Sequence, residues 1–461
     1  MGEPAVVKKA PPSVMSQKGK VGHLARSVPA NDSAGRKRVL TSWMIGLGFI
    51  LTLTSAVAWG GPLRFVSTQL TRFEEAVKMR SLILKDFSRE VDFQPCDDRQ
   101  VFEALVDECV AGPTKIDIIG ALHGDFSHRA DAGSLENVDD IMASLEDREF
   151  VKDFISLGKL ARPYQSYIPW MQATYIMVAN HRALKHLPRG AVLDHLSYEQ
   201  LGEWAFNMLE ETGKAKLGFP VEGLMHRFLQ GYLYPSYTGS TLRKFRSREA
   251  EAMWVAFRDL WQYVNPRSLT CCEMDQPLLA GEVWVAWDHT ARIAEALEHR
   301  PKEFVAFPAP FGPRGRGFML VLAGLAIPKC VQDREGSQKL IEYLTRPETQ
   351  TETLRNLFFF PVLSRGGREG LPPGLTQLNE ALRKQRTAED AVKTLLPTGL
   401  RNQDKAFNMA YKRAFSQIVL RGRDIRSVLD EQAEILRRIL TETGARCWPP
   451  DERCDGPCPV D

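Results

Sequence analysis

The sequence of 461 residues lacks the short motifs that mark common hydrolases and nucleotide-binding proteins. It has no G-x-S-x-G, no H-E-x-x-H and no Cys-x-x-Cys, so the usual serine, zinc and paired-thiol sites are missing. The glycine-rich run GPRGRGF at 312–318 lacks the Lys-Ser/Thr of a phosphate-binding loop and precedes an apolar strand. We therefore predict no cofactor, no metal and no catalytic residue. The absence of these motifs does not exclude a glycosidase, because its two catalytic carboxylates can lie anywhere in a sequence.

A strong charge of either sign is also missing. The formal net charge is +3, and the first 38 residues alone carry +6, which leaves −3 for the rest of the chain. The basic excess therefore belongs to a tail, and a nucleic-acid partner is not expected. That tail is rich in Pro, Ser, Gly and Lys and poor in large apolar residues, so we expect it to be disordered.

No charged residue occurs between positions 39 and 63, and Arg36, Lys37 and Arg38 come directly before this stretch. A basic flank followed by an apolar run is typical of an export signal. Ala56 and Ala58 are small residues at the positions that a signal peptidase reads, so cleavage would fall before Trp59. The run is also long enough to span a bilayer uncut, and the protein would then stay tethered by an N-terminal helix. A buried core helix is the less favoured alternative.

Eight cysteines suit an exported chain, in which disulfides persist. Cys96 and Cys109 flank one predicted helix whose length separates their backbones by roughly 18 Å, and a disulfide needs less than about 7 Å. We expect Cys271, Cys272 and Cys330 to be structural or free. The tail adds three more in a short proline-rich segment, for which a local disulfide is preferred over free thiols or a zinc site: Cys447, Cys454 and Cys458.

Strands and helices alternate from the start of the folded part. Strands are expected at 63–68, 91–93 and 116–119, with helices between them, which predicts parallel strands joined by right-handed crossovers. Ligands meet such sheets at the carboxyl ends of the strands. Gln69 follows the first strand, and His123 and Asp125 are expected in a loop after the third.

The stretch 278–329 organises the second half of the chain. A strand at 281–289 ends in Trp287 and Asp288, and Asp288 can cap the helix that follows. A second strand is expected at 304–310 and a third, almost wholly apolar and therefore buried on both faces, at 318–328. We expect Trp287 to lie at the strand end over a cleft, so that its loss would weaken ligand binding and leave stability nearly unchanged.

The order of these segments resembles the extracellular solute-binding proteins of ABC importers, in the maltose- and trehalose-type sugar-binding group. The resemblance covers roughly residues 63–440 and rests on the order and spacing of several motifs: LRFVSTQLT, KIDIIGALHGDF, YIPWMQATYIMVANHRAL, GEVWVAWDH, FPAPFGPRGRGFMLVLAGLAIPK, IEYLTRPETQ and FFFPVLS. It implies an α/β, two-lobed periplasmic-binding-protein fold with a ligand cleft between lobes joined by hinge strands. The hinge segments would lie at 168–175 and 307–317.

The resemblance also implies which side chains face the cleft. Carried over by position, the ligand-binding candidates are Gln69, His123, Asp125, Trp170, Gln172, Arg227, Tyr234, Tyr237, Trp287 and Asp288. Aromatic rings and neutral or charged hydrogen-bonding groups together suit a sugar. Taken singly, Trp170 and Tyr234 would more often be core residues, and His123 would more often be a satisfied loop histidine than a ligand contact. Helix capping alone would fully explain Asp288. The glycine-rich loop lacks a tryptophan that some relatives carry, so the sugar is not identified.

The same resemblance divides the chain into segments. We expect a disordered basic tail, a signal peptide or anchor, a first part of lobe 1, a first part of lobe 2, a return to lobe 1, the C-terminal helices of lobe 2 and a Cys/Pro-rich tail set apart from the main body. Their bounds are 1–38, 39–58, 62–170, 171–306, 307–355, 356–445 and 446–461.

The expected function is capture of a sugar or oligosaccharide outside the cytoplasmic membrane and its delivery to the permease of an ABC importer. The protein would act as a monomer, without catalysis, either released or held at the membrane by its N-terminal helix. Two alternatives remain open from the sequence: an extracellular carbohydrate-active enzyme, and a membrane-tethered sugar sensor with the same fold.

Overall fold

The computed structural model describes residues 61–112, 114–365 and 370–461. The basic tail expected at 1–38 and the export segment expected at 39–58 lie outside these residues. Within the described part of the chain, no helix has the length and apolar character needed to cross a bilayer.

The first sheet begins with the alternation of strands and helices that the sequence predicts. β1 (Leu63–Ser67) pairs in parallel with β2 (Val91–Pro95) on one side and with β3 (Ile118–Leu122) on the other. α1 (Phe73–Lys78) follows β1, and α2 (Arg99–Ala111) follows β2. The parallel βαβαβ start is therefore confirmed, and this sheet with its helices forms lobe 1.

The loop expected after β3 is instead the start of a helix. α3 (His123–Asp131) begins directly at the end of the strand, because the Asp125 carboxylate accepts a hydrogen bond from the Leu122 amide at 3.2 Å. A disulfide joins Cys109 at the end of α2 to Cys330. The remaining helices of lobe 1 are α4 (Asp139–Ser144), α5 (Lys152–Gly158), α12 (Arg334–Leu344) and α13 (Pro347–Leu357).

A second, four-stranded sheet forms the centre of lobe 2. Its order is β6 (Leu217–Gly218), β7 (Val285–His289), β5 (Tyr175–Asn180) and β8 (Phe304–Phe307). The strand expected at 281–289 is thus shorter than predicted. Before it, the amides of Trp284 and Val285 both donate to the carbonyl of Lys216, at 2.8 and 3.1 Å.

Helices surround this second sheet. Ser197 caps α6 through its side chain, and Ser247 caps α9 in the same way, as expected for serine at a helix start. The helices of lobe 2 before the C-terminal region are α6 (Tyr198–Thr212), α7 (Val221–Phe228), α8 (Tyr234–Thr238), α9 (Arg248–Trp261), α10 (Asp275–Leu279), α11 (Thr290–His299) and α14 (Pro373–Thr387).

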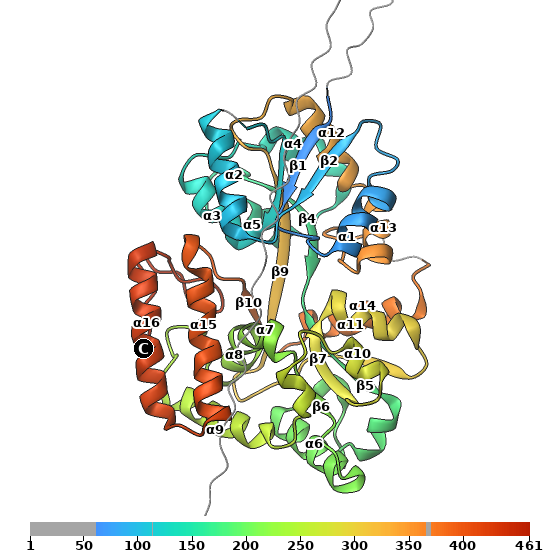
Figure 1. Cartoon of the computed structure of the whole chain (residues 1–461), viewed down its shortest axis with the longest axis vertical. Helices are drawn as coiled ribbons and strands as arrows, with labels where there is room; N and C mark the ends of the chain where they lie inside the picture. Colours follow the sequence, from blue (N-terminus) through green and yellow to red (C-terminus); the bar gives the residue numbers. More distant parts are fainter. Residues whose placement is uncertain (1–60, 113, 366–369) are drawn as a thin grey trace, which may run out of the picture. The chain divides into compact units, whose positions relative to one another are not determined.

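Two strand segments connect the lobes. β4 (Ile168–Ala173) belongs to the first sheet, and after Thr174 the chain enters β5 of the second sheet. The long strand β9 (Arg316–Ala326) pairs with β3 and β4 through its later residues and with β10 (Ala391–Leu395) through its first five. Figure 1 shows β9 running from the group of elements around β1 to the group around β10 and α8.

Side-chain hydrogen bonds hold the connection between β4 and β5 in place. The Thr174 hydroxyl donates to the Met319 carbonyl at 2.6 Å, which ties the crossing to β9. The Tyr232 hydroxyl, from the π-helical turn Leu229–Leu233, accepts from the Tyr175 amide at 3.0 Å. The crossover expected at 168–175 is therefore present, with Thr174 as the residue between the two sheets.

The C-terminal region packs on lobe 2. α15 (Asp404–Phe415) lies beside α16 (Ile425–Thr443), and these two helices contact α7 and α9 (Figure 1). Val428, Leu436 and Leu440 recur at helical spacing on α16 and are fully buried. The terminal helix is therefore amphipathic, and its apolar face packs into lobe 2.

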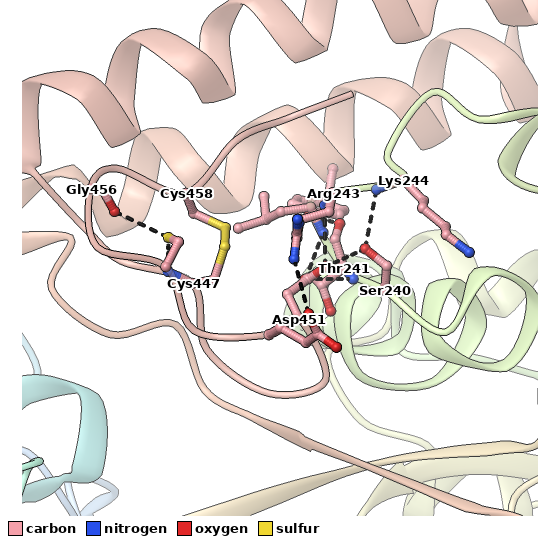
Figure 2. The surroundings of a disulfide bond; sticks show 12 residues. Ser240, Thr241, Arg243, Lys244, Cys447, Asp451, Gly456 and Cys458 are labelled. Atoms are coloured by element: carbon pink, nitrogen blue, oxygen red, sulfur yellow. Dashed lines mark hydrogen bonds and ion pairs between the residues drawn. A yellow bond between two sulfur atoms is a disulfide. The ribbon is translucent and has the colours of Figure 1, made fainter.

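The expectation that the Cys/Pro-rich tail stands apart from the body is wrong. Cys447 and Cys458 form the local disulfide, and the Asp451 carboxylate accepts hydrogen bonds from the amides of Thr241 and Leu242 at 2.8 and 2.9 Å (Figure 2). The tail is therefore an integral part of lobe 2. Trp448 adds to this anchoring, because its buried ring packs against Phe407.

Candidate functional site

A cavity of about 130 Å³ lies at the carboxyl ends of β1, β2 and β3, where lobe 1 meets α7 and α15. Polar and charged side chains form most of its wall. The lining residues are Thr68, Gln69, Asp97, Arg99, Leu122, Gly124, Asp125, Arg227, Leu396, Pro397 and Asp404. Three of the ten candidates from the sequence, Gln69, Asp125 and Arg227, are thus brought together around one space.

Arg99 joins the lobes at this cavity. Its guanidinium lies 2.9 Å from the Asp125 carboxylate in lobe 1 and 2.6 Å from the Asp404 carboxylate at the start of α15. Asp98 caps α2 and thereby fixes the backbone from which Arg99 projects. Gln69 is held beside this network, because its side-chain amide donates to the Thr68 hydroxyl at 3.1 Å.

Arg227 faces the same cavity from α7 with an unused hydrogen-bonding group. Its Nη1 atom is buried and has no hydrogen-bond partner among the described residues. A buried donor without a partner costs about 1–3 kcal/mol. Arg227 is therefore a guanidinium placed in a cavity and available to a ligand.

A second group of charged side chains closes the interlobe region near α1 and α11. Arg292 of α11 pairs with Glu75 of α1, and it lies 3.5 Å from Glu273. Arg72, just before α1, also pairs with Glu273. Ion pairs thus also join lobe 1 to lobe 2 near α1 and α11.

The buried aromatic candidates do not reach this cavity. Trp170 is 1 % exposed and packs against Phe65 in the core of lobe 1, with 5.5 Å between ring centroids. Tyr234 is fully buried in lobe 2, where its hydroxyl donates to the Phe245 carbonyl and accepts from the Trp254 indole, both at 3.0 Å. Burial raises the pKa of Tyr234 well above its usual range.

Trp287 lies in the middle of β7 and not at its end, and the expectation of a ring exposed to a cleft is wrong. Its side chain is 0 % exposed and stacks on Tyr175, with 4.8 Å between ring centroids and 12° between ring planes. Phe228 and Tyr232 meet it edge-on at 5.0 and 5.2 Å. Trp287 therefore supports Tyr175 from behind and offers no free face of its own.

Asp288 is also buried, and it does not cap the helix after β7. His289 caps α11 through its Nδ1 atom, whereas the Asp288 carboxylate accepts from the amides of Met274 at 2.7 Å and His289 at 2.6 Å. Burial raises the pKa of Asp288 to about 7, against the opposing effect of these hydrogen bonds. These contacts show that the Asp288 carboxylate joins the start of α10 to β7.

The other three candidates lie at separate places. His123 is buried with its Nδ1 atom 2.8 Å from the Tyr167 hydroxyl, and burial lowers the pKa of His123 to about 4. The Gln172 amide donates to the Pro361 carbonyl at 2.6 Å, beside the strands that connect the lobes. Tyr237 lines a groove of about 580 Å³ between α6 and α9 on lobe 2, away from the cavity.

Sequence reasoning missed Arg99 and Asp404, which line the cavity together with the three candidates. Arg99 and Asp97 directly follow β2, so the carboxyl-end rule that selected Gln69 would have selected them too. Asp404 carries no such signal, because it starts a late helix and reaches Arg99 only through the fold.

Asp404 gives this network a pH dependence. Burial raises the pKa of Asp404 from its usual 3.8 to about 6, and the attraction of Arg99, which Asp125 and Glu103 share, only partly opposes this shift. Between pH 3.8 and about 6, the Asp404 carboxyl keeps its proton in the folded protein but has lost it in the unfolded chain. The free energy of unfolding therefore falls as pH rises through this range. Asparagine does not titrate, so wild type should lose stability relative to Asp404→Asn across this window.

Urea denaturation of wild type and Asp404→Asn at several pH values from about 4 to 7 checks this expectation. All other groups titrate in both proteins, so the difference between the two plots of unfolding free energy against pH reports the titration of residue 404. A difference that stays flat with pH would contradict the shifted pKa.

One cluster in the described part of the chain has the ligand types and spacing for a metal ion, namely Cys447, Cys454 and Cys458. Two of its three sulfurs are already joined in a disulfide. The cavity at Arg99 holds aspartates but is crossed by two ion pairs to arginine, so its chemistry is that of hydrogen bonding to a polar ligand.

Comparisons with known proteins agree with this architecture. Residues 84–365 match the family model described as bacterial extracellular solute-binding protein. No curated protein matches the sequence. Among solved structures, maltose-bound MalE3 of T. maritima is similar with a TM-score of 0.67 at 17% identity, covering 83% of this chain and 100% of that one.

Two further structures are similar over the same share of this chain. The sugar-binding protein MalE of Xanthomonas citri has a TM-score of 0.66 at 15% identity and is covered over 98% of its length. UgpB of Mycobacterium tuberculosis, in complex with glycerophosphocholine, has a TM-score of 0.64 at 17% identity and is covered over 99%. These likenesses confirm the two-lobed α/β fold.

Proposed function

We propose that this chain, which belongs to the bacterial extracellular solute-binding proteins, captures a sugar or oligosaccharide between its lobes and delivers it to the permease of an ABC importer. The observation that carries the proposal is the cavity at the strand ends, where Gln69 and Asp125 of lobe 1 meet Arg227 of lobe 2. Amide, carboxylate and guanidinium groups are suitable partners for sugar hydroxyls, since together they donate and accept hydrogen bonds.

The similar solved structures support this ligand class. MalE3 holds maltose, and the Xanthomonas citri protein is a sugar-binding protein. UgpB holds glycerophosphocholine, so the same fold also accepts a polar ligand that is not a sugar. The charged wall around Arg99 and Asp404 suits a ligand with many polar groups in either case.

Capture requires the lobes to open. A cavity of about 130 Å³ is smaller than the roughly 300–1,000 Å³ typical of small-molecule sites, so a saccharide enters only when the walls separate. The connections at Thr174 and along β9 are where the chain bends, as in the hinge closure by which periplasmic binding proteins enclose their ligands. The ion pairs of Arg99 and Arg292 join the lobes in the closed form.

As a member of an extracellular family, the protein acts outside the cytoplasm. Its ABC permease is the partner at the membrane, and one monomer delivers one ligand. The charge-free run at 39–63 either is removed before Trp59 or stays as an N-terminal anchor. Mass spectrometry of the native protein distinguishes these states, because cleavage gives an N-terminus at or near Trp59.

The purified protein should bind a saccharide without consuming it. A thermal-shift screen over mono- and oligosaccharides identifies the ligand, since a compound that binds only the folded state raises the melting temperature. Calorimetric titration then gives the affinity, and chromatography of the sugar after long incubation tests for conversion. Turnover of a glycan by the pure protein would support a carbohydrate-active enzyme instead.

A further inference from the structure

A large groove of about 1,000 Å³ separates the helices of lobe 1 from the C-terminal tail. One wall comes from α3 and from the segment after α5, including Leu160, Ala161 and Arg162. The other wall comes from residues 398–401 and 443–453. No residue lines both this groove and the cavity at Arg99, so the two are separate sites.

The groove is strongly basic. Four arginines line it, Arg162, Arg401, Arg446 and Arg453, against one acidic residue, Asp131. Asp131 already pairs with Arg162 at 2.5 Å. The other three arginines are exposed and make no ion pair with any described residue. Residues 39–461 carry a net charge of −3, so this concentration of positive charge is local and is not a property of the whole body.

The backbone of the groove supports a built site. Leu160, Ala161 and Arg401 adopt φ values of 51°, 61° and 52°, in the left-handed region that non-glycine residues rarely occupy. Each such residue costs on the order of 1–3 kcal/mol, and residues of this kind cluster at ligand-binding sites. Within the described residues, six non-glycine positions have positive φ, and half of them line this groove.

We propose that this groove binds a small, multiply charged anion that carries phosphate groups. Arginine guanidinium groups match phosphate oxygens with paired, charge-assisted hydrogen bonds, and Arg401, Arg446 and Arg453 have these donors free of ion pairs. All three arginines line the same concave groove, which a small anion can enter, whereas a flat membrane surface would meet only the rim. The site is distinct from the proposed sugar cavity, because no residue lines both.

The test uses tripolyphosphate as the probe and the full chain as the protein. Calorimetric titration compares wild type with the triple variant Arg401→Gln, Arg446→Gln, Arg453→Gln, in chloride buffer of constant ionic strength. Arg421→Gln is the matched control, because Arg421 is also exposed but follows the far end of α15 and its π-helical extension Ser416–Leu420. Thermal melts confirm that each variant is folded.

We expect wild type and Arg421→Gln to bind tripolyphosphate equally and the triple variant to bind about tenfold more weakly, since three exposed ion contacts are lost. Binding should also weaken with added salt. Saccharide affinity should be the same in all three proteins, which separates this site from the cavity at Arg99. Equal tripolyphosphate affinity in the triple variant, or binding to anionic phospholipid vesicles without binding to tripolyphosphate, would overturn the proposal.

Discussion

Replacing Trp287 with alanine is expected to lower the free energy of unfolding by about 3–5 kcal/mol. The indole is fully buried and packs between Tyr175, Phe228 and Tyr232, with centroid distances of 4.8, 5.0 and 5.2 Å. Truncation removes this packing and leaves a cavity that a close-packed core cannot fill by relaxation. Urea denaturation followed by circular dichroism measures the change.

Trp284→Ala is the matched control for this substitution. Trp284 is close in sequence but only partly buried, with Lys216 over its ring at 4.9 Å, so its loss should cost less. Unchanged stability together with weaker binding would instead support the sequence-based expectation of a ring exposed to the cleft.

Asp451→Ala should destabilise the protein by about 3–5 kcal/mol, because it leaves several buried donors without an acceptor. Asp451 is 5 % exposed and accepts from the amides of Thr241, Leu242 and Arg243 at 2.8, 2.9 and 3.2 Å, and also from the Ser240 hydroxyl (Figure 2). This one carboxylate fastens the C-terminal tail to the turn after α8. Thermal and urea unfolding of the purified variant measure the loss.

Asp455→Ala is the matched control, because Asp455 is an exposed aspartate of the same tail. Its substitution should change stability by less than about 0.5 kcal/mol. Removal of residues 446–461 should be at least as damaging as Asp451→Ala, since it also deletes Trp448 and the disulfide. A deletion variant as stable as wild type would contradict the integral role of the tail.

The parts of the fold that local patterns control could be predicted from the sequence. The alternation of strand and helix through 63–119 led to the parallel start, and the apolar run that became β9 was correctly expected to be buried. The crossover at 168–175 was implied by the resemblance, and it agrees with Pro169, which excludes a helix there, and with the β-branched residues after it. In each of these segments the information lies within about ten consecutive residues.

The candidate site was predicted less well because its geometry depends on contacts between distant segments. Position at a strand end selected Gln69 and Asp125, the resemblance to a family added Arg227, and all three line one cavity. Periodicity placed Trp287 on the same face as two buried valines but did not say that Tyr175, from another strand, covers its ring. The Arg99–Asp404 pair joins residues that no local pattern relates.

The tail illustrates the same limit. Proline, glycine and three cysteines between 447 and 461 are typical of a segment outside the core, and the local disulfide was expected from them. The anchoring of Asp451 on Thr241 and its neighbours depends on the turn after α8, about two hundred residues earlier in the sequence. Composition cannot reveal a partner at that separation.

A polar solute is expected to bind in the cavity between Gln69, Asp125 and Arg227, and the affinity of Arg227→Ala tests this assignment most directly. Calorimetric titration of wild type, Arg227→Ala and the remote control Arg421→Ala with the saccharide found by screening gives three dissociation constants. Losing hydrogen bonds from a guanidinium should weaken binding about tenfold to a hundredfold, near 1.5–3 kcal/mol, while stability changes little because Nη1 has no partner among the described residues. Arg421→Ala should bind as wild type does. Equal affinity of Arg227→Ala and wild type would contradict the assignment of this cavity as the binding site.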